Sequence, residues 1–146
     1  MATYITEEQV ASEARLGSSG FTSSTNPTST KASEIIDEVE AEIDCIIATK
    51  YAIPLTQTRN IALVRSIALA IAAARVRKII DSNLPENAEQ SLHQKAEKDA
   101  RSRLADILHN RLLLLGEEPA VSGNGIKSYA SSNGLTPTFE RDTQQW

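Results

Sequence analysis

The stretch of sequence that decides the fold is TRNIALVRSIALAIAAARVRKIIDS, residues Thr58–Ser82. Between Ile61 and Ala74 only Arg65 and Ser66 interrupt the apolar residues. A helix with so few polar positions must be covered from water over most of its surface. We therefore expect this segment to be the central, buried helix of the fold.

Two faces of this helix are suited to packing. One face carries the bulky side chains of Leu63, Val64, Ile67 and Ile71. The nearly opposite face carries the small residues Ala62, Ser66, Ala70 and Ala73, and small side chains allow a neighbouring helix to approach closely. The uninterrupted apolar run, Ile67–Ala74, is much shorter than the roughly 20 residues of a membrane span. The pattern favours a core helix over a membrane helix.

The composition indicates one domain with an aliphatic core. A chain of 146 residues has the usual length of a single domain. Aromatic residues make up only 4% of it, which suits packed helices better than a sheet. The formal net charge of -4 provides no overall attraction to nucleic acid. We expect the single cysteine, Cys45, to be a small buried hydrophobe, because isoleucines surround it in sequence.

A first helix is predicted over Glu7–Leu16. Thr6 and Gln9 have the spacing of a capping box at its start, and Gly17 is placed to end it. The next segment, 18–30, consists mainly of Ser, Thr, Gly, Asn and Pro, so it reads as a loop in which Phe21 is the only large apolar residue. The amino-terminal residues have no basic region followed by an apolar run. Secretion is therefore not indicated, and we expect a protein that is intracellular or is part of an assembly built inside a cell.

A second helix is predicted to begin after a capping residue within 28–30 and to run to about Lys50. Its apolar residues recur at helical spacing: Ile35, Ile36, Val39, Ile43, Ile46 and Ile47. Its remaining surface is acidic: Glu34, Asp37, Glu38, Glu40, Glu42 and Asp44. These carboxylates could bind a metal or form an acid–base pair, but a solvated face, or a face that meets a basic surface on another chain, is the favoured interpretation.

A fourth helix is predicted from Pro85 to a left-handed cap at Gly116. Its apolar stripe consists of Leu92, Ala96, Ala100, Leu104, Ile107, Leu108, Leu112 and Leu115. Its outer surface is partly basic: Lys95, Lys98, Arg101, Arg103 and Arg111. Because the turn before it is short, this helix should run antiparallel to the central helix. The expected fold class is thus all-α, a small helical bundle.

The last segment, 117–146, is rich in Ser, Gly and Asn, and its apolar residues are scattered. It cannot form a core of its own. We expect a helical domain over 1–116 followed by an extended C-terminal arm over 117–146 that docks on a partner through sparse aromatic anchors. The alternative is a disordered tail.

The sequence contains few signals of catalysis. His93 and His109 lie about four helical turns apart, too far to bind one ion, and they lack the Glu-x-x-His pairs of a di-iron bundle. Asp106 and His109 have the spacing of a surface contact. Phosphate-binding loops, nucleophile elbows and Cys-x-x-Cys pairs are absent from the sequence. We expect a protein that is not an enzyme and that has no cofactor and no metal site.

Several short motifs, in order, resemble one known family. They are Tyr4-Ile5-Thr6-Glu7, Ala41-Glu42-Ile43-Asp44, Lys50-Tyr51, Ile53-Pro54-Leu55, the Ala-rich helix and Phe139-Glu140-Arg141-Asp142-Thr143. Together they look like the Mu-like family of tailed-phage head-to-tail adaptor, or head-completion, proteins. The loop over 18–30 departs from the family pattern.

The resemblance implies an all-helical virion protein of the neck region, assembled in the bacterial cytoplasm. It implies a ring, commonly of twelve copies, that sits beneath the portal protein and leaves a channel for DNA. Its arm would dock on the portal, and its other face would receive a neck or tail-completion protein or a tail terminator.

The candidate site residues follow from this interpretation. The expected portal-binding anchors in the arm are Tyr129, Phe139, Arg141 and Trp146. The expected contacts between subunits pair acidic with basic residues: Glu38 and Glu42 with Arg75, Arg77, Arg101 and Arg103. Two other functions stay open, a small helical DNA-binding packaging or regulatory protein and a helical-bundle enzyme that gathers Asp106, His109 and the acidic helix into one site.

Overall fold

A computed structural model of the chain describes residues 4–16, 20–83 and 88–120. Within these ranges the protein contains four α-helices and one 3₁₀ turn: α1 (Glu7–Glu13), α2 (Ser29–Ile47), α3 (Thr58–Ile80), η1 (Asp81–Asn83) and α4 (Ala88–Leu108). The described residues form no strand, and their one β-bridge joins Tyr51 to Pro119. The predicted all-α fold is confirmed.

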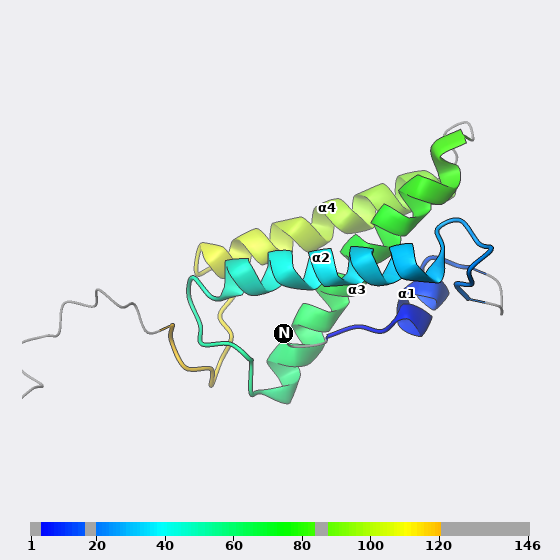
Figure 1. Ribbon diagram of the computed structural model, residues 1–146. Helices are drawn as coiled ribbons and strands as arrows, with labels where there is room; N and C mark the ends of the chain where they lie inside the picture. The colour runs from blue at the N-terminus through cyan, green and yellow to red at the C-terminus, as the bar shows by residue number, and fades with distance from the viewer. Residues whose placement is uncertain (1–3, 17–19, 84–87, 121–146) are drawn as a thin grey trace, which may run out of the picture.

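Helix α3 is the centre of the bundle, as predicted. It contacts each of the other three helices, and its longest interface is with α4. Figure 1 shows that α4 runs beside α3, antiparallel to it, while α2 crosses α3 on another side. The short helix α1 packs against both α2 and α3. Within the described residues, no helix is both long and apolar enough to cross a membrane.

The core is aliphatic, as the composition predicts. Its fully buried side chains come from every helix and from the amino-terminal segment: Ile5, Val10, Val39, Ile43, Ile47, Val64, Ile67, Ile71, Val76 and Ile107. Phe21 packs against this core from the Ser/Thr-rich loop. Burial of large aliphatic side chains contributes about 1.5 to 3 kcal/mol each to the free energy of unfolding, so this cluster is the main source of stability.

The expected close-packed face of small residues on α3 is only half covered. Ala73 is buried and Ala70 is partly buried, but Ala62 and Ser66 are exposed. The prediction was therefore wrong for the first half of the helix.

The local signals at the helix starts are mostly confirmed. Thr6 and Gln9 form both bonds of the capping box that begins α1, and Thr28 is the residue that caps α2. At the start of α3, neither Thr56 nor Thr58 is the cap, because Gln57 occupies the N-cap position without a side-chain capping bond.

Helix α1 ends three residues before the predicted position. Its last residue is Glu13, and Arg15 adopts the left-handed conformation with φ 52°. The Leu16 N–H donates to the Ala11 carbonyl at 2.9 Å, and the Arg15 N–H donates to the Ser12 carbonyl at 3.1 Å. These two bonds form a Schellman motif that satisfies the last carbonyls of the helix.

The C-terminal half of α2 also differs from expectation. The helix ends at Ile47 and not near Lys50. Cys45 is exposed, so its predicted burial is wrong. The reason is that Ile43 and Ile47 point to the core from one side of the helix, and Cys45 lies on another side.

Helix α4 was predicted to reach Gly116, but it ends at Leu108. Asn110 takes the left-handed conformation with φ 59°, and the Arg111 N–H donates to the Asp106 carbonyl at 2.8 Å. This arrangement is again a Schellman motif, with asparagine in place of glycine. The predicted start of α4 at Pro85 lies outside the described residues.

The four leucines that follow α4, Leu112 to Leu115, lie in an irregular segment, and their exposure alternates. Leu114 is buried and Leu112 is partly buried, while Leu113 and Leu115 are 54% and 76% exposed. Alternation of this kind is the side-chain period of an extended chain, not of a helix. Gly116 does adopt a left-handed conformation with φ 79°. It lies in a turn of this segment and not at the end of α4.

Candidate functional site

The carboxylate of Glu117 binds the start of α3. It accepts hydrogen bonds from the backbone N–H groups of Thr56 and Gln57 at 2.9 and 2.8 Å, from the Thr56 hydroxyl at 3.1 Å and from the Asn60 amide at 3.0 Å. The same Asn60 amide donates to the Leu115 carbonyl at 3.0 Å. A negative charge at the N-terminus of a helix is favoured by the helix dipole. Glu117 therefore acts as the cap that the Gln57 side chain does not provide.

These contacts change the pKa of Glu117. Partial burial acts to raise it, but the Thr56 N–H, the Asn60 amide and the Gln57 N–H together outweigh burial and lower the pKa of the Glu117 carboxyl. Hydrogen bonds to a carboxylate stabilise its charged form. The ionised Glu117 carboxylate is therefore the form that makes the junction between residues 115–117 and the start of α3.

Two backbone bonds continue the junction toward the carboxyl end of the chain. The Ala52 N–H donates to the Glu118 carbonyl at 2.8 Å, and the Ala120 N–H donates to the Lys50 carbonyl at 2.9 Å. The first four residues of the predicted arm thus pair with the connection between α2 and α3. Ala120, the last described residue, is therefore held against the body of the protein.

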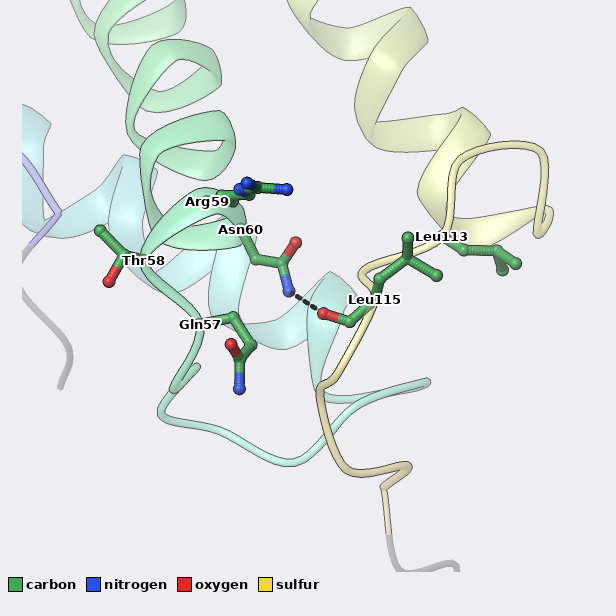
Figure 2. Close-up of a pocket in the computed structure, with 6 residues that line it drawn as sticks. All are labelled: Gln57, Thr58, Arg59, Asn60, Leu113 and Leu115. Atoms are coloured by element: carbon green, nitrogen blue, oxygen red, sulfur yellow. Dashed lines mark hydrogen bonds between the residues drawn. The ribbon is translucent and has the colours of Figure 1, made fainter.

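A pocket of about 440 Å³ lies beside this junction. Figure 2 shows its lining: the first turn of α3 on one side and the extended leucine segment on the other, joined by the bond from Asn60 to Leu115. The residues that line it are Gln57, Thr58, Arg59, Asn60, Leu113 and Leu115. It combines two exposed leucines with one guanidinium group, which suits contact with another protein surface better than catalysis.

The structure brings three of the predicted subunit-contact residues together within one chain. Arg101 binds the Glu42 carboxylate at 2.6 Å, and Arg75 binds the other oxygen of the same carboxylate. Arg75 also lies 3.6 Å from Glu38. This network joins α2, α3 and α4, so it stabilises the bundle itself.

The pKa of Glu42 reflects this network. Burial acts to raise it, but the hydrogen bond and charge of Arg101, together with those of Arg75, lower the pKa of the carboxyl. Glu42 stays ionised and paired. Its predicted contact with another subunit remains a prediction, and it competes with these contacts inside the chain.

The other two predicted basic residues have different surroundings. Arg77 lies 3.7 Å from the buried carboxylate of Asp81, one turn later in sequence. Arg103 is exposed on α4. Of the four predicted basic residues, Arg103 is the one best placed for the predicted contact with an acidic residue of another subunit.

Two carboxylates of the acidic helix are buried and bind the amino-terminal segment. Glu40 accepts bonds from the backbone N–H groups of Tyr4 and Ile5 at 2.6 and 2.9 Å, and Asp44 accepts a bond from the Tyr4 hydroxyl at 2.7 Å. Arg65 donates to the Tyr4 carbonyl at 2.9 Å. Burial and the bond to Asp44 raise the pKa of the Tyr4 phenol. Sequence reasoning missed this site because its partners lie about 40 residues apart.

The residues considered for catalysis do not gather into a site. Asp106 faces Arg111 at 3.7 Å, and His109 is exposed after the end of α4. Among the described residues, no three His, Cys, Asp or Glu side chains lie close enough to hold a metal ion. The predicted portal anchors Tyr129, Phe139, Arg141 and Trp146 all fall in 121–146, outside the described residues.

Comparison of this chain with models of known protein families, with curated protein sequences and with solved structures finds no match.

Proposed function

We propose that this chain is a non-enzymatic adaptor of a tailed-phage virion. In this proposal, copies form a ring between the portal and the neck or tail-completion proteins and leave a channel open for DNA. The ordered motifs that resemble the Mu-like adaptor family support it, and the all-helical fold is compatible with it. The overall charge of -4 also suits a channel, because a lining that bound phosphates strongly would slow the passage of DNA.

The observation that carries the proposal is the anchored start of the arm. Glu117 and Ala120 tie the chain to the region around the start of α3, and 26 residues follow in the sequence. A segment that is polar, carries a few aromatic side chains and leaves a rigid body at one point is suited to docking on a partner. In this proposal the partner is the portal protein.

The test is binding of the full-length chain to the portal protein of the same phage. Phe139→Ala and Trp146→Ala should each weaken binding by about tenfold or more, because truncation of a buried aromatic anchor commonly costs more than 1 kcal/mol. Ile126→Ala, in the same segment, is the matched control and should change binding little. Equal binding by all four proteins would refute the role of the arm.

The same experiment addresses the second function that the sequence leaves open. A DNA-binding packaging or regulatory protein would ignore the portal and bind DNA with an affinity that falls steeply with salt. Exposed basic residues on α4, such as Lys95, Lys98 and Arg103, are the surface that would carry this activity. Salt-dependent DNA binding without portal binding would replace the adaptor proposal.

A further inference from the structure

The pocket beside the start of α3 has a lining that is partly apolar and partly charged. Leu113 and Leu115, which are 54% and 76% exposed, line one side, and the exposed Arg59 lines the other. Figure 2 shows Arg59 and Asn60 on the side of α3 that faces the leucine segment. The volume of about 440 Å³ is in the range of sites that hold a small ligand or a few side chains. A group that covers the two leucines removes apolar surface from water, which is favourable.

The Arg59 guanidinium is available to a ligand of this pocket. Within the described part of the chain it makes no hydrogen bond and no ion pair. The nearby Glu117 carboxylate is held by donors of Thr56, Gln57 and Asn60 and does not pair with it. Other arginines each bind an oxygen atom of this chain: Arg65, Arg75, Arg101 and Arg111. The pocket therefore fits a ligand that carries an apolar group next to a carboxylate.

The chain itself carries such a pair of groups after its last described residue. The sequence of 121–146 contains only two acidic residues, Glu140 and Asp142. Glu140 directly follows the large apolar Phe139, whereas Asp142 follows an arginine. Phe139-Glu140 is therefore the one place in this segment where an aromatic side chain is next to a carboxylate. Its ring is complementary to the leucines of the pocket, and its charge is complementary to the guanidinium group.

The connection is long enough for Phe139 to reach the pocket. Ala120 is held by its bond to the Lys50 carbonyl, and it lies five residues after Leu115, so their Cα atoms are at most about 18 Å apart. Phe139 follows about 20 residues later, and a chain of that length can reach about 65 Å. Because the tether makes binding intramolecular, the effective concentration of Phe139 at the pocket is on the order of millimolar. A free ligand must bind tightly to compete with a segment that is always present at this concentration.

We infer that Phe139 and Glu140 of the arm occupy the pocket of their own chain. The Phe139 ring lies against Leu113 and Leu115, and the Glu140 carboxylate pairs with Arg59. This contact does not depend on the proposed function, but it adds a step to it. Phe139 is a predicted portal anchor, so in the isolated chain the anchor is covered, and the portal must displace it from the body of the protein.

Methyl NMR of the full-length chain tests the contact, because an aromatic ring shifts the resonances of methyl groups that lie against it. Phe139→Leu should change the methyl resonances of Leu113 and Leu115 relative to the wild type. Tyr129→Leu removes another aromatic ring from the same segment and should leave these resonances unchanged. If the resonances of both leucines are the same in the wild type and in Phe139→Leu, the inference is overturned.

A charge exchange tests the ion pair with the same resonances. In a chain that carries Arg59→Glu, the further change Phe139→Leu should no longer affect them, because two like charges now repel each other. When Glu140→Arg is added to Arg59→Glu, Phe139→Leu should affect them again, since residues in contact show such coupling. Arg103→Glu makes the same charge change at an exposed position on α4 and should leave the effect of Phe139→Leu intact. An effect of Phe139→Leu that persists in full in the Arg59→Glu chain would contradict the pairing and overturn the inference.

A mixed sample shows whose arm fills the pocket. Isotope-labelled wild-type chain, refolded together with a large excess of unlabelled Phe139→Leu chain, should keep the wild-type resonances of Leu113 and Leu115, because each chain fills its own pocket. Loss of these resonances would assign the contact to the arm of a neighbouring copy and overturn the inference.

These results are distinct from the outcome of the portal-binding test. A chain that shows the contact but ignores the portal keeps this inference and loses the adaptor proposal. A chain that binds the portal without showing the contact keeps the adaptor proposal and loses this inference.

Discussion

Glu117 accepts a hydrogen bond from the backbone N–H of Gln57 at 2.8 Å, across 60 residues of sequence. This bond joins the end of the described chain to the first turn of its longest helix. The junction fixes the point at which the arm leaves the body, and it shapes the pocket that Leu115 and Arg59 line. The Glu117 carboxylate therefore caps α3, holds the start of the arm against the body and shapes the pocket.

Glu117→Ala should lower the free energy of unfolding by about 1 to 2 kcal/mol, the usual effect of losing a helix cap. It should also speed hydrogen exchange at the amides of Thr56 and Gln57, which lose their acceptor. Glu118→Ala is the matched control, since its side chain is exposed, and should change stability by less than about 0.5 kcal/mol. Unchanged exchange at Thr56 and Gln57 would show that Glu117 is not the cap.

Tyr4→Phe should destabilise the protein by about 1 to 3 kcal/mol. The substitution keeps the ring but removes the donor to the buried Asp44 carboxylate, and a buried acceptor without its partner carries a desolvation cost. Tyr51→Phe is a useful comparison, because the Tyr51 hydroxyl accepts a bond from the Leu114 N–H at a partly buried site. Chemical denaturation of both variants checks this. A Tyr4→Phe protein as stable as the wild type would contradict the assigned bond.

Glu42→Lys should destabilise the bundle by about 1 to 2 kcal/mol, because it breaks two ion pairs and places like charges together. The loss should appear in a chain that is kept monomeric by dilution. Glu34→Lys changes the charge of α2 by the same amount at an exposed position and should cost less. A Glu42→Lys protein that is fully stable but fails to assemble would instead support a contact between subunits.

Stability should fall in acid as Glu42 and Glu117 become protonated. Both have a folded-state pKa below the ordinary glutamate value of about 4.3. The unfolded chain therefore binds protons first, so the stabilising contribution is complete above about pH 4.3 and is lost as the pH falls through the lower folded-state values. Denaturation curves between pH 7 and pH 3 measure this. Glu117→Gln should show a shallower decline, and an identical decline would show that Glu117 does not contribute.

The sequence predicts the fold wherever the signal is local. The capping box of Thr6 and Gln9 needs only four consecutive residues, and the stripe through Val64, Ile67 and Ile71 is visible in a single helix. Such features depend on neighbours in the chain. They were found because backbone capping and apolar burial follow short, regular spacings.

The ends of α1 and α4 were harder to predict for a physical reason. Glycine is the usual residue in the left-handed position after a helix, but here Arg15 and Asn110 occupy it. After Asn110, leucines continue at spacings that also fit a helix, so the apolar pattern does not reveal the change to an extended chain. Leu115 is exposed only because that change occurs.

The candidate site was the least predictable part. Glu117 meets Gln57 across 60 residues, and Glu42 meets Arg101 across 59. Charge alone does not show which acid meets which base, and the composition of α2 gives no sign that Glu40 and Asp44 are buried while Asp37 is exposed. These choices follow from how the helices pack.

The central claim is that the chain forms a ring that joins the portal through its arm. Light scattering of the full-length chain, alone and mixed with the portal protein, tests it most directly, with a chain that ends at Ala120 as the comparison. Ending at Ala120 keeps the Glu117 cap, which a chain ending at Gly116 would lose. The account predicts that the full-length chain adds the mass of a ring to the portal and that the shortened chain adds none. A full-length chain that stays a single copy and leaves the mass of the portal unchanged would contradict it.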